Sequence, residues 1–124
     1  MKSERTEGII LHTLPVKDWD LILTVFTQKF GLMKFFYRKG QSRRRNQGSA
    51  ASPLTRAEFI FSQHASELTP LQELSTIDVN FELRQTFEKL ESSCRWLRLI
   101  KNSQLPGKPA ADLYLLLLSY LRGL

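Results

Sequence analysis

The sequence contains little of what catalytic and metal sites usually need. Its single cysteine, Cys94, excludes an internal disulfide and a multi-cysteine zinc site. The two histidines, His12 and His64, have no spacing that suggests a shared site, and we expect His12 to be a structural residue of an apolar strand. A glycine-rich phosphate loop and a nucleophile elbow are both missing. The sequence therefore predicts no enzyme, no metal site and no cofactor.

Long hydrophobic runs are missing as well. The longest, Leu113–Leu118, is far shorter than the roughly 20 residues that span a membrane. The first residues, Met1–Glu7, have no apolar segment after their charges, which argues against a signal peptide. We therefore expect a soluble, cytoplasmic protein.

Positive charge is in excess, and only in one half of the chain. The net charge is +6 over 124 residues. Residues 1–60 hold 11 Lys and Arg against 5 Asp and Glu, whereas residues 61–124 hold 7 of each. The first half therefore carries the whole excess, which favours a localised site for a polyanion.

The densest positive charge directly follows the aromatic stretch Phe35–Tyr37. Five cations lie within eight residues there: Arg38, Lys39, Arg43, Arg44 and Arg45. Such a cluster repels itself unless a polyanion is near. Aromatic rings for bases beside guanidinium groups for phosphates are typical of single-strand binding. From the residues of this segment alone, a solvated, mobile loop is an equally good interpretation.

Five short segments in the first three-fifths of the chain indicate β-strands. They are rich in branched and aromatic residues and are bounded by turn residues: 7–14, 20–27, 31–38, 54–62 and 67–77. No helical period runs through them, and a five-stranded OB-fold barrel fits their number best. Pro70 predicts that the fifth strand is an edge or contains a bulge.

The third strand predicts an unusual outer face. Side chains alternate along a strand, so Lys34, Phe36 and Arg38 share one face with Leu32, opposite Met33, Phe35 and Tyr37. Cations beside an aromatic ring suit nucleic acid better than burial, although for Phe36 stacking on a base and simple packing weigh equally. In the fourth strand we expect Ala57, Phe59 and Phe61 inside the barrel, with Arg56 and Glu58 outside.

Two helices are predicted to follow. Leu83, Phe87, Leu90, Cys94 and Leu97 form the apolar stripe of an amphipathic helix over 82–101, capped by Asp78 or Asn80, with Cys94 an inert core thiol. After the break at 105–109, residues 110–121 form a helix that is apolar nearly all round and must be covered on most sides. We expect this region to be the start of a longer helical domain, or to be completed by another subunit.

The two tryptophans have predicted places as well. Trp19 lies in a polar turn, where packing on the barrel mouth is the favoured interpretation and base stacking the alternative. Trp96 lies beside the helix stripe and is expected in the contact between helix and barrel.

The order of these features resembles the opening of the bacterial RecO recombination mediators. The resemblance runs through Thr6–Leu11, Asp20–Thr27 and Phe30–Leu32 to Arg38-Lys39-Gly40 and Ser52-Pro53-Leu54, and it covers roughly residues 6–80 closely. It implies an N-terminal OB fold over 1–80 and a helical region over 81–124. It also implies binding of single- and double-stranded DNA, strand annealing and recombinase loading, with RecR and single-strand-binding protein as partners.

The resemblance implies DNA contacts at the basic positions Arg38, Lys39, Arg43, Arg44 and Arg45. Lys34, Phe36 and Arg56 are added from the strand pattern. Family members are about twice as long, and many carry a zinc-binding cysteine cluster, which Cys94 alone cannot form. The leading hypothesis is a DNA-binding mediator module that grips the backbone with little sequence readout. Two alternatives are a protein-interaction OB domain and an RNA-binding OB domain.

Overall fold

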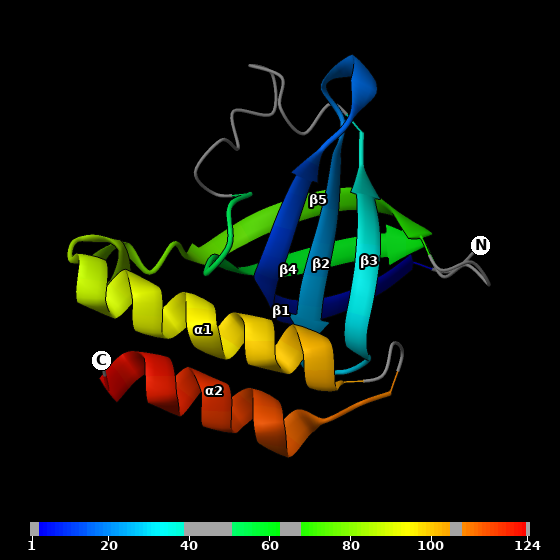
Figure 1. Ribbon diagram of the computed structural model, residues 1–124. Coiled ribbons are helices and arrows are strands. Elements are labelled where there is room, and N and C mark those ends of the chain that lie inside the picture. The colour runs from blue at the N-terminus through cyan, green and yellow to red at the C-terminus, as the bar shows by residue number, and fades with distance from the viewer. Residues whose placement is uncertain (1–2, 39–50, 63–67, 105–107, 124) are drawn as a thin grey trace.

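The computed structural model describes residues 3–38, 51–62, 68–104 and 108–123. Five strands form a closed barrel in the order β1-β2-β3-β5-β4, and two helices follow (Figure 1). The strands are β1 (Ser3–Pro15), β2 (Leu21–Thr27), β3 (Gly31–Tyr37), β4 (Arg56–Ser62) and β5 (Leu68–Asp78). The helices are the short η1 (Lys17–Trp19) and η2 (Phe81–Arg84), then α1 (Phe87–Ser103) and α2 (Ala111–Gly123). The predicted OB-type barrel with two helices is confirmed.

β1 is the longest strand, and its two halves pair with different neighbours. Its first half pairs antiparallel with β4, from Ser3↔Ser62 to Ile9↔Arg56, and its second half pairs with β2, from Gly8↔Thr27 to Pro15↔Leu21. The prediction began this strand at Glu7, four residues late. Ser3–Thr6 lack the apolar alternation of a strand, and they are held in the sheet by their backbone pairing with β4.

The predicted positions of the other strands are confirmed within a few residues. β2 begins at Leu21, β3 ends at Tyr37 and β4 begins at Arg56, so each is shorter than predicted. Leu54, expected in the fourth strand, has a positive φ of 79° and cannot continue an extended strand. β5 lies between β3 and β4, so Pro70 is not on an edge. β5 does contain a bulge, the alternative that Pro70 predicted, and it lies at Gln72, between the pairs Phe61↔Leu71 and Ile60↔Glu73.

The barrel interior is filled by the predicted inward side chains. Phe35, Phe59 and Phe61 are each no more than 1 % exposed, and the Phe35 ring stacks on Phe59 with centroids 5.4 Å apart. Tyr37 and Ala57 belong to the same buried cluster, with Met33 packed against it. The alternation predicted for the third and fourth strands is therefore confirmed.

A second buried cluster joins the barrel to the helices. The barrel contributes outward-facing residues, and the helices contribute one face each: Ile9, Leu11, Phe26, Leu32 and Leu54 meet Leu83, Leu97, Ile100, Tyr114, Leu117 and Leu121. The Tyr114 ring meets Phe26 edge to face at 5.8 Å. Gly31, with φ of +70°, lies so close to Lys108 that a Cβ there would clash with the Lys108 carbonyl. The connection between the helices therefore packs directly on the turn between β2 and β3.

The helices differ from their predicted start and contacts. Thr86 caps α1, because its hydroxyl accepts a hydrogen bond from the Lys89 N–H at 3.2 Å, whereas Asp78 and Asn80 precede the separate helix η2. Phe87, predicted on the buried stripe, is 77 % exposed. Cys94 is only half-buried. Trp96, expected in the contact between helix and barrel, packs on Tyr120 of α2, with ring centroids 4.8 Å apart.

Candidate nucleic-acid interface

The outer surface of β1, β2 and β3 has two halves. Helices α1 and α2 lie across the lower ends of these strands in Figure 1 and leave the upper part uncovered. The uncovered half, here called the open face, consists of six outward residues on and directly after the three strands: His12, Leu14, Ile22, Lys34, Phe36 and Arg38. His12, Leu14, Lys34 and Arg38 are exposed, whereas Ile22 and Phe36 are half-buried.

Strand register arranges the open face in two rows. In one row Leu14 pairs with Ile22, Ile22 with Phe36, and Phe36 with Pro70 of β5. In the next row His12 pairs with Thr24, Thr24 with Lys34, and Lys34 with Leu68. An apolar row that contains an aromatic ring therefore lies beside a row that contains a cation, which is the arrangement that suits a base and its phosphate.

A bulge in β1 puts His12 on this surface. The register shifts between Ile10 and His12, so Leu11 is the extra residue. Ile10 points into the barrel and Leu11 into the cluster under the helices. Without the bulge, alternation would turn His12 inward with Ile10. His12, expected to be a structural residue of an apolar strand, is therefore exposed on the outer face of the barrel.

The surroundings of His12 lower the pKa of its imidazole. Partial burial lowers it below its ordinary value of 6.5, and the positive charges of Lys101 and Lys34 lower it further. Lys34 belongs to β3 and Lys101 to α1.

The structure describes only some of the predicted contact residues. Lys34 and Arg38 are exposed and Phe36 lies between them on the same face, as predicted. Lys39, Arg43, Arg44 and Arg45 lie outside the described residues, as does His64. Arg38 directly follows β3, so the open face leads into the most basic stretch of the sequence.

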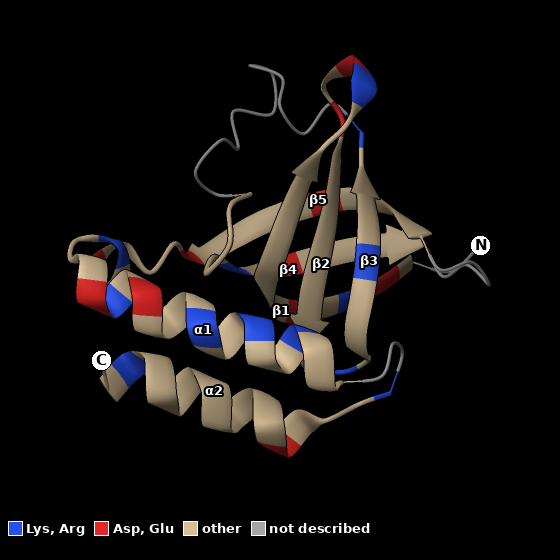
Figure 2. Ribbon diagram, in the orientation of Figure 1, with Lys and Arg blue, Asp and Glu red and all other residues tan. Residues whose placement is uncertain are grey.

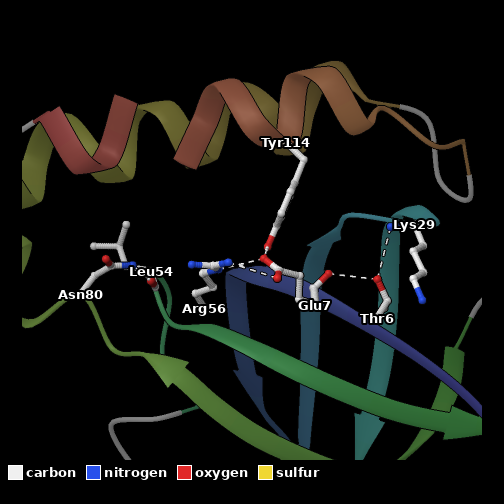
Figure 3. Close-up of polar contacts among 7 residues, drawn as sticks. All are labelled: Thr6, Glu7, Lys29, Leu54, Arg56, Asn80 and Tyr114. Atoms are coloured by element: carbon white, nitrogen blue, oxygen red, sulfur yellow. Dashed lines mark hydrogen bonds and ion pairs between the residues drawn. The ribbon is translucent and has the colours of Figure 1, made fainter. Parts of the chain in front are cut away.

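Arg56 has a different environment from the other predicted contacts. Its Nε and Nη2 donate to the two carboxylate oxygens of Glu7, at 2.8 and 3.1 Å, and the Tyr114 hydroxyl donates to Glu7 Oε2 at 2.7 Å (Figure 3). These contacts link β1, β4 and α2. We therefore leave Arg56 out of the interface that we propose below, because its guanidinium already has a carboxylate partner.

The same network shifts the pKa of each of its members. Burial alone would raise the pKa of Glu7, but the hydrogen bonds from Arg56 and Tyr114 outweigh it and hold the pKa below 4.5. The hydrogen bond to Glu7 raises the pKa of Arg56. Burial, together with the hydrogen bond to Glu7, raises the pKa of Tyr114 far above its ordinary value. The contact is thus an ion pair with a neutral phenol as a second donor.

The tip between β1 and β2 presents the second aromatic residue of this region. Trp19 is 64 % exposed and has a φ of 67°, directly after Asp18 with a φ of 63°. Left-handed backbone is costly for a bulky side chain, and such strain often lies at functional sites. The favoured prediction, that Trp19 packs on the barrel mouth, is wrong. Most of the residue is instead exposed, and Lys17, two residues earlier, is exposed as well.

Sequence reasoning missed three members of the open face: His12, Leu14 and Ile22. Their apolar or neutral character gave no signal of function, and only the pairing register brings them beside Phe36 and Lys34. Within the described ranges, no group of three or more His, Cys, Asp or Glu side chains could hold a metal ion. No helix in the part of the chain that the structure describes is long and apolar enough to cross a membrane.

The closed barrel, the open face and the two appended helices together define an OB-fold module. Comparison with known proteins gives its family. The family described as recombination protein O, N terminal, matches residues 1–80, which is more than half of the chain. The chain therefore belongs to the RecO family, as its sequence features predicted.

Curated relatives extend the match beyond the barrel. The DNA repair protein RecO of Syntrophus aciditrophicus (strain SB) is 27% identical over 120 residues, covering 96% of this chain and 46% of that protein. The DNA repair protein RecO of Chlamydia pneumoniae is 25% identical over 92% of this chain and 45% of its own length. That of Thermodesulfovibrio yellowstonii is 26% identical over 94% and 46%. The chain thus spans a little under half the length of these relatives.

Proposed function

We propose that the open face and the basic segment after it bind single-stranded DNA. The observation that carries this proposal is the position of Phe36, half-buried in an apolar row and flanked on the same face by exposed Lys34 and Arg38. In OB folds the second and third strands and the tip between the first two form the usual oligonucleotide surface. Here those elements carry Ile22, Phe36 and Trp19.

The proposed mechanism is electrostatic capture with stacking. Lys34 and Arg38 neutralise phosphates and release counterions, while Phe36 and Trp19 offer faces on which any base can stack. Lys39, Arg43, Arg44 and Arg45 would extend the phosphate contacts. Because neither a phosphate contact nor a stacked ring reads base edges, we expect affinity with little sequence preference.

The wider activity of the protein follows from the same chemistry. Two complementary strands repel one another, and a protein that neutralises phosphates on both lowers that repulsion and favours their annealing. The relatives are named for DNA repair, which favours DNA over RNA as the ligand. Double-strand binding, annealing, recombinase loading and contacts with RecR and single-strand-binding protein belong to this proposal, with residues 1–80 as the binding unit and 81–124 as the start of a helical domain.

The test is a charge-matched comparison of two double variants. Lys34→Gln/Arg38→Gln removes two cations from the open face, and Arg5→Gln/Arg122→Gln removes two exposed cations elsewhere. Titration of fluorescent single-stranded DNA at several salt concentrations gives the salt slope of log affinity. We expect the first variant to lower the slope by about 1.4, since each lost single-strand contact removes about 0.7. Equal slopes for the two variants would overturn the proposal.

Two further titrations separate the alternatives. An RNA strand of the same sequence should bind no more tightly than the DNA if the ligand is DNA, because backbone contacts alone hardly distinguish the two. A clear preference for RNA would reassign the site to RNA. A protein-interaction domain would bind neither strand at physiological salt.

A further inference from the structure

We propose that the nucleic-acid path continues from the open face onto helix α1, through the row Arg95, Arg98 and Lys101. This inference rests on the proposed function and extends it to a second element. A strand that crosses Phe36 and Lys34 would pass His12, reach Lys101 and then follow the row toward Arg95. Figure 2 shows the cations concerned on β3 and along the second half of α1.

The charges of α1 are separated along its length. Its acidic residues, Glu88 and Glu91, lie in the first half, and the stretch 92–104 contains Arg95, Arg98 and Lys101 but no acid. Attraction to the helix dipole explains cations only within the last turn. It accounts for Lys101, near the end at Ser103, but not for Arg95, more than two turns earlier. Arg95 pairs with Glu91 one turn earlier, so Arg98 is the cation of the row that neither the dipole nor an ion pair among the described residues accounts for.

Helical geometry places Lys101 and Arg98 on the flank of α1 opposite α2, whereas Arg95 points away from the barrel. Ser93, Leu97 and Ile100 are buried and define the side of α1 that faces the barrel. Trp96 contacts Tyr120, so α2 lies on one flank of α1. At about 100° per residue, Lys101 and Arg98 fall roughly 40° and 100° from Leu97 on the other flank, and Arg95 follows at about 160°.

His12 shows that the row is continuous with the open face. Lys101 and Lys34 both depress the pKa of its imidazole, from α1 and β3 respectively. The packing agrees with this, because Ile100, next to Lys101, belongs to the same buried cluster as Leu32, two residues before Lys34. A phosphate at this junction would give the strand a contact at the point where it changes from sheet to helix.

The cations of the row are available to a ligand. Among the described residues, Arg98 and Lys101 form no ion pair. Arg95 pairs with Glu91 at 2.8 Å, but both side chains are largely exposed, at 70% and 44%, and exposed pairs of this kind contribute little. Arg95 can therefore exchange its carboxylate for a phosphate. Glu91 marks the end of the path, because a phosphate beyond it would meet an acid.

The inference predicts that strand length decides which residues matter. An oligonucleotide of about eight nucleotides lies within the range that one OB barrel occupies, so it should need the open face alone. A strand of about 30 nucleotides exceeds that range and should use the α1 row as well. Arg98→Gln/Lys101→Gln is the test variant, and Arg5→Gln/Arg122→Gln is the charge-matched control.

We expect the test variant to lower the salt slope for the long strand by about 1.4 and its affinity roughly fivefold to tenfold, with affinity for the short strand changed less than twofold. The control should change neither. If Lys34→Gln/Arg38→Gln weakens both strands while Arg98→Gln/Lys101→Gln matches the control, the extension along α1 is wrong and the open-face site stands. If neither variant differs from the control, the proposed function itself fails. Thermal unfolding of each variant checks that the loss is not one of folding.

Discussion

The same three strands, β1, β2 and β3, present two kinds of surface along their length. The outward residues at one end, Ile9, Leu11, Phe26 and Leu32, are no more than 7 % exposed and lie under the helices. At the other end the outward residues are those of the open face, where Lys34 and Arg38 are exposed. The covered half has the composition of a core. The open half keeps an aromatic residue, half-buried Phe36, with the exposed cations Lys34 and Arg38 before and after it on the same face.

This difference separates stability from binding within one sheet. Changes in the covered half should alter the free energy of unfolding and reach the ligand only through folding. Changes in the open half should alter affinity and leave unfolding nearly unchanged. Substitutions at four residues test whether stability and binding are separated in this way.

The largest effect is expected at Tyr114, the centre of the covered half. Tyr114→Ala removes a fully buried ring that packs on Phe26 and bonds Glu7, so the free energy of unfolding should fall by about 3–5 kcal/mol. Tyr114→Phe keeps the ring and loses only the hydrogen bond to a carboxylate, at about 1.5–3 kcal/mol. Chemical denaturation measures both. A loss for Tyr114→Ala no greater than for Tyr114→Phe would contradict the packing role.

Glu7 should give a smaller effect that depends on pH. Its folded pKa is lowered, so its contribution is present above the ordinary value of 4.5 and is lost as the pH falls through the folded value. Glu7→Gln should cost about 2 kcal/mol at neutral pH and progressively less in acid. Denaturation curves at a series of pH values test this. A penalty that stays constant down to the acid limit would show that the Glu7 charge does not matter.

Phe36 should affect affinity and spare stability. Phe36→Leu keeps apolar contact with Ile22 and Pro70 but removes the aromatic face, so single-strand affinity should fall by about 1 kcal/mol, roughly fivefold. Phe87→Leu, which removes an exposed aromatic ring at the start of α1 and outside the open face, is the matched control and should leave affinity unchanged. Thermal unfolding should differ little among the three proteins. A large drop in melting temperature without loss of affinity would make Phe36 a core residue.

The smallest effect is expected from His12. A bound phosphate offsets the repulsion from Lys34 and Lys101 that lowers the pKa of its imidazole, so binding should take up a proton. Affinity for single-stranded DNA should rise about twofold as the pH falls from about 7.5 to 6. His12→Gln, which leaves His64 in place, should flatten this dependence. An equal rise in both proteins would assign the proton to another group.

The sequence predicted the architecture better than the site. Alternation of apolar residues located the five strands and the inward side chains, because each barrel strand has one face in the core. It could not show the bulge at Leu11, which depends on pairing with β2 and decides that His12 faces outward. The apolar stripe of the helix was also predicted incorrectly. Phe87 fits a 3.6-residue period, yet it lies at the start of α1 and is 77 % exposed.

Charge was the part of the site that the sequence could locate. Lys34, Phe36 and Arg38 share one face as predicted, since two-residue periodicity within a strand needs no knowledge of its partners. Arg56 fits the same rule, but its partner Glu7 lies 49 residues away and Tyr114 lies on the last helix. Long-range pairing of this kind has no local signature, so a cation that completes the fold resembles one that binds a ligand.

The parallel pairing of β3 with β5 closes the barrel with only three residue pairs, Lys34↔Leu68, Phe35↔Thr69 and Phe36↔Pro70, the shortest ladder among the described strands. Pro70 has no N–H to donate to it, so we expect this short ladder to open locally more easily than the longer ladders of the barrel. Lys34 and Phe36 of the open face belong to this ladder. Single-stranded DNA bound across it would hold β3 and β5 together, so amide exchange across β3 and β5 should slow on binding more than exchange between β1 and β4.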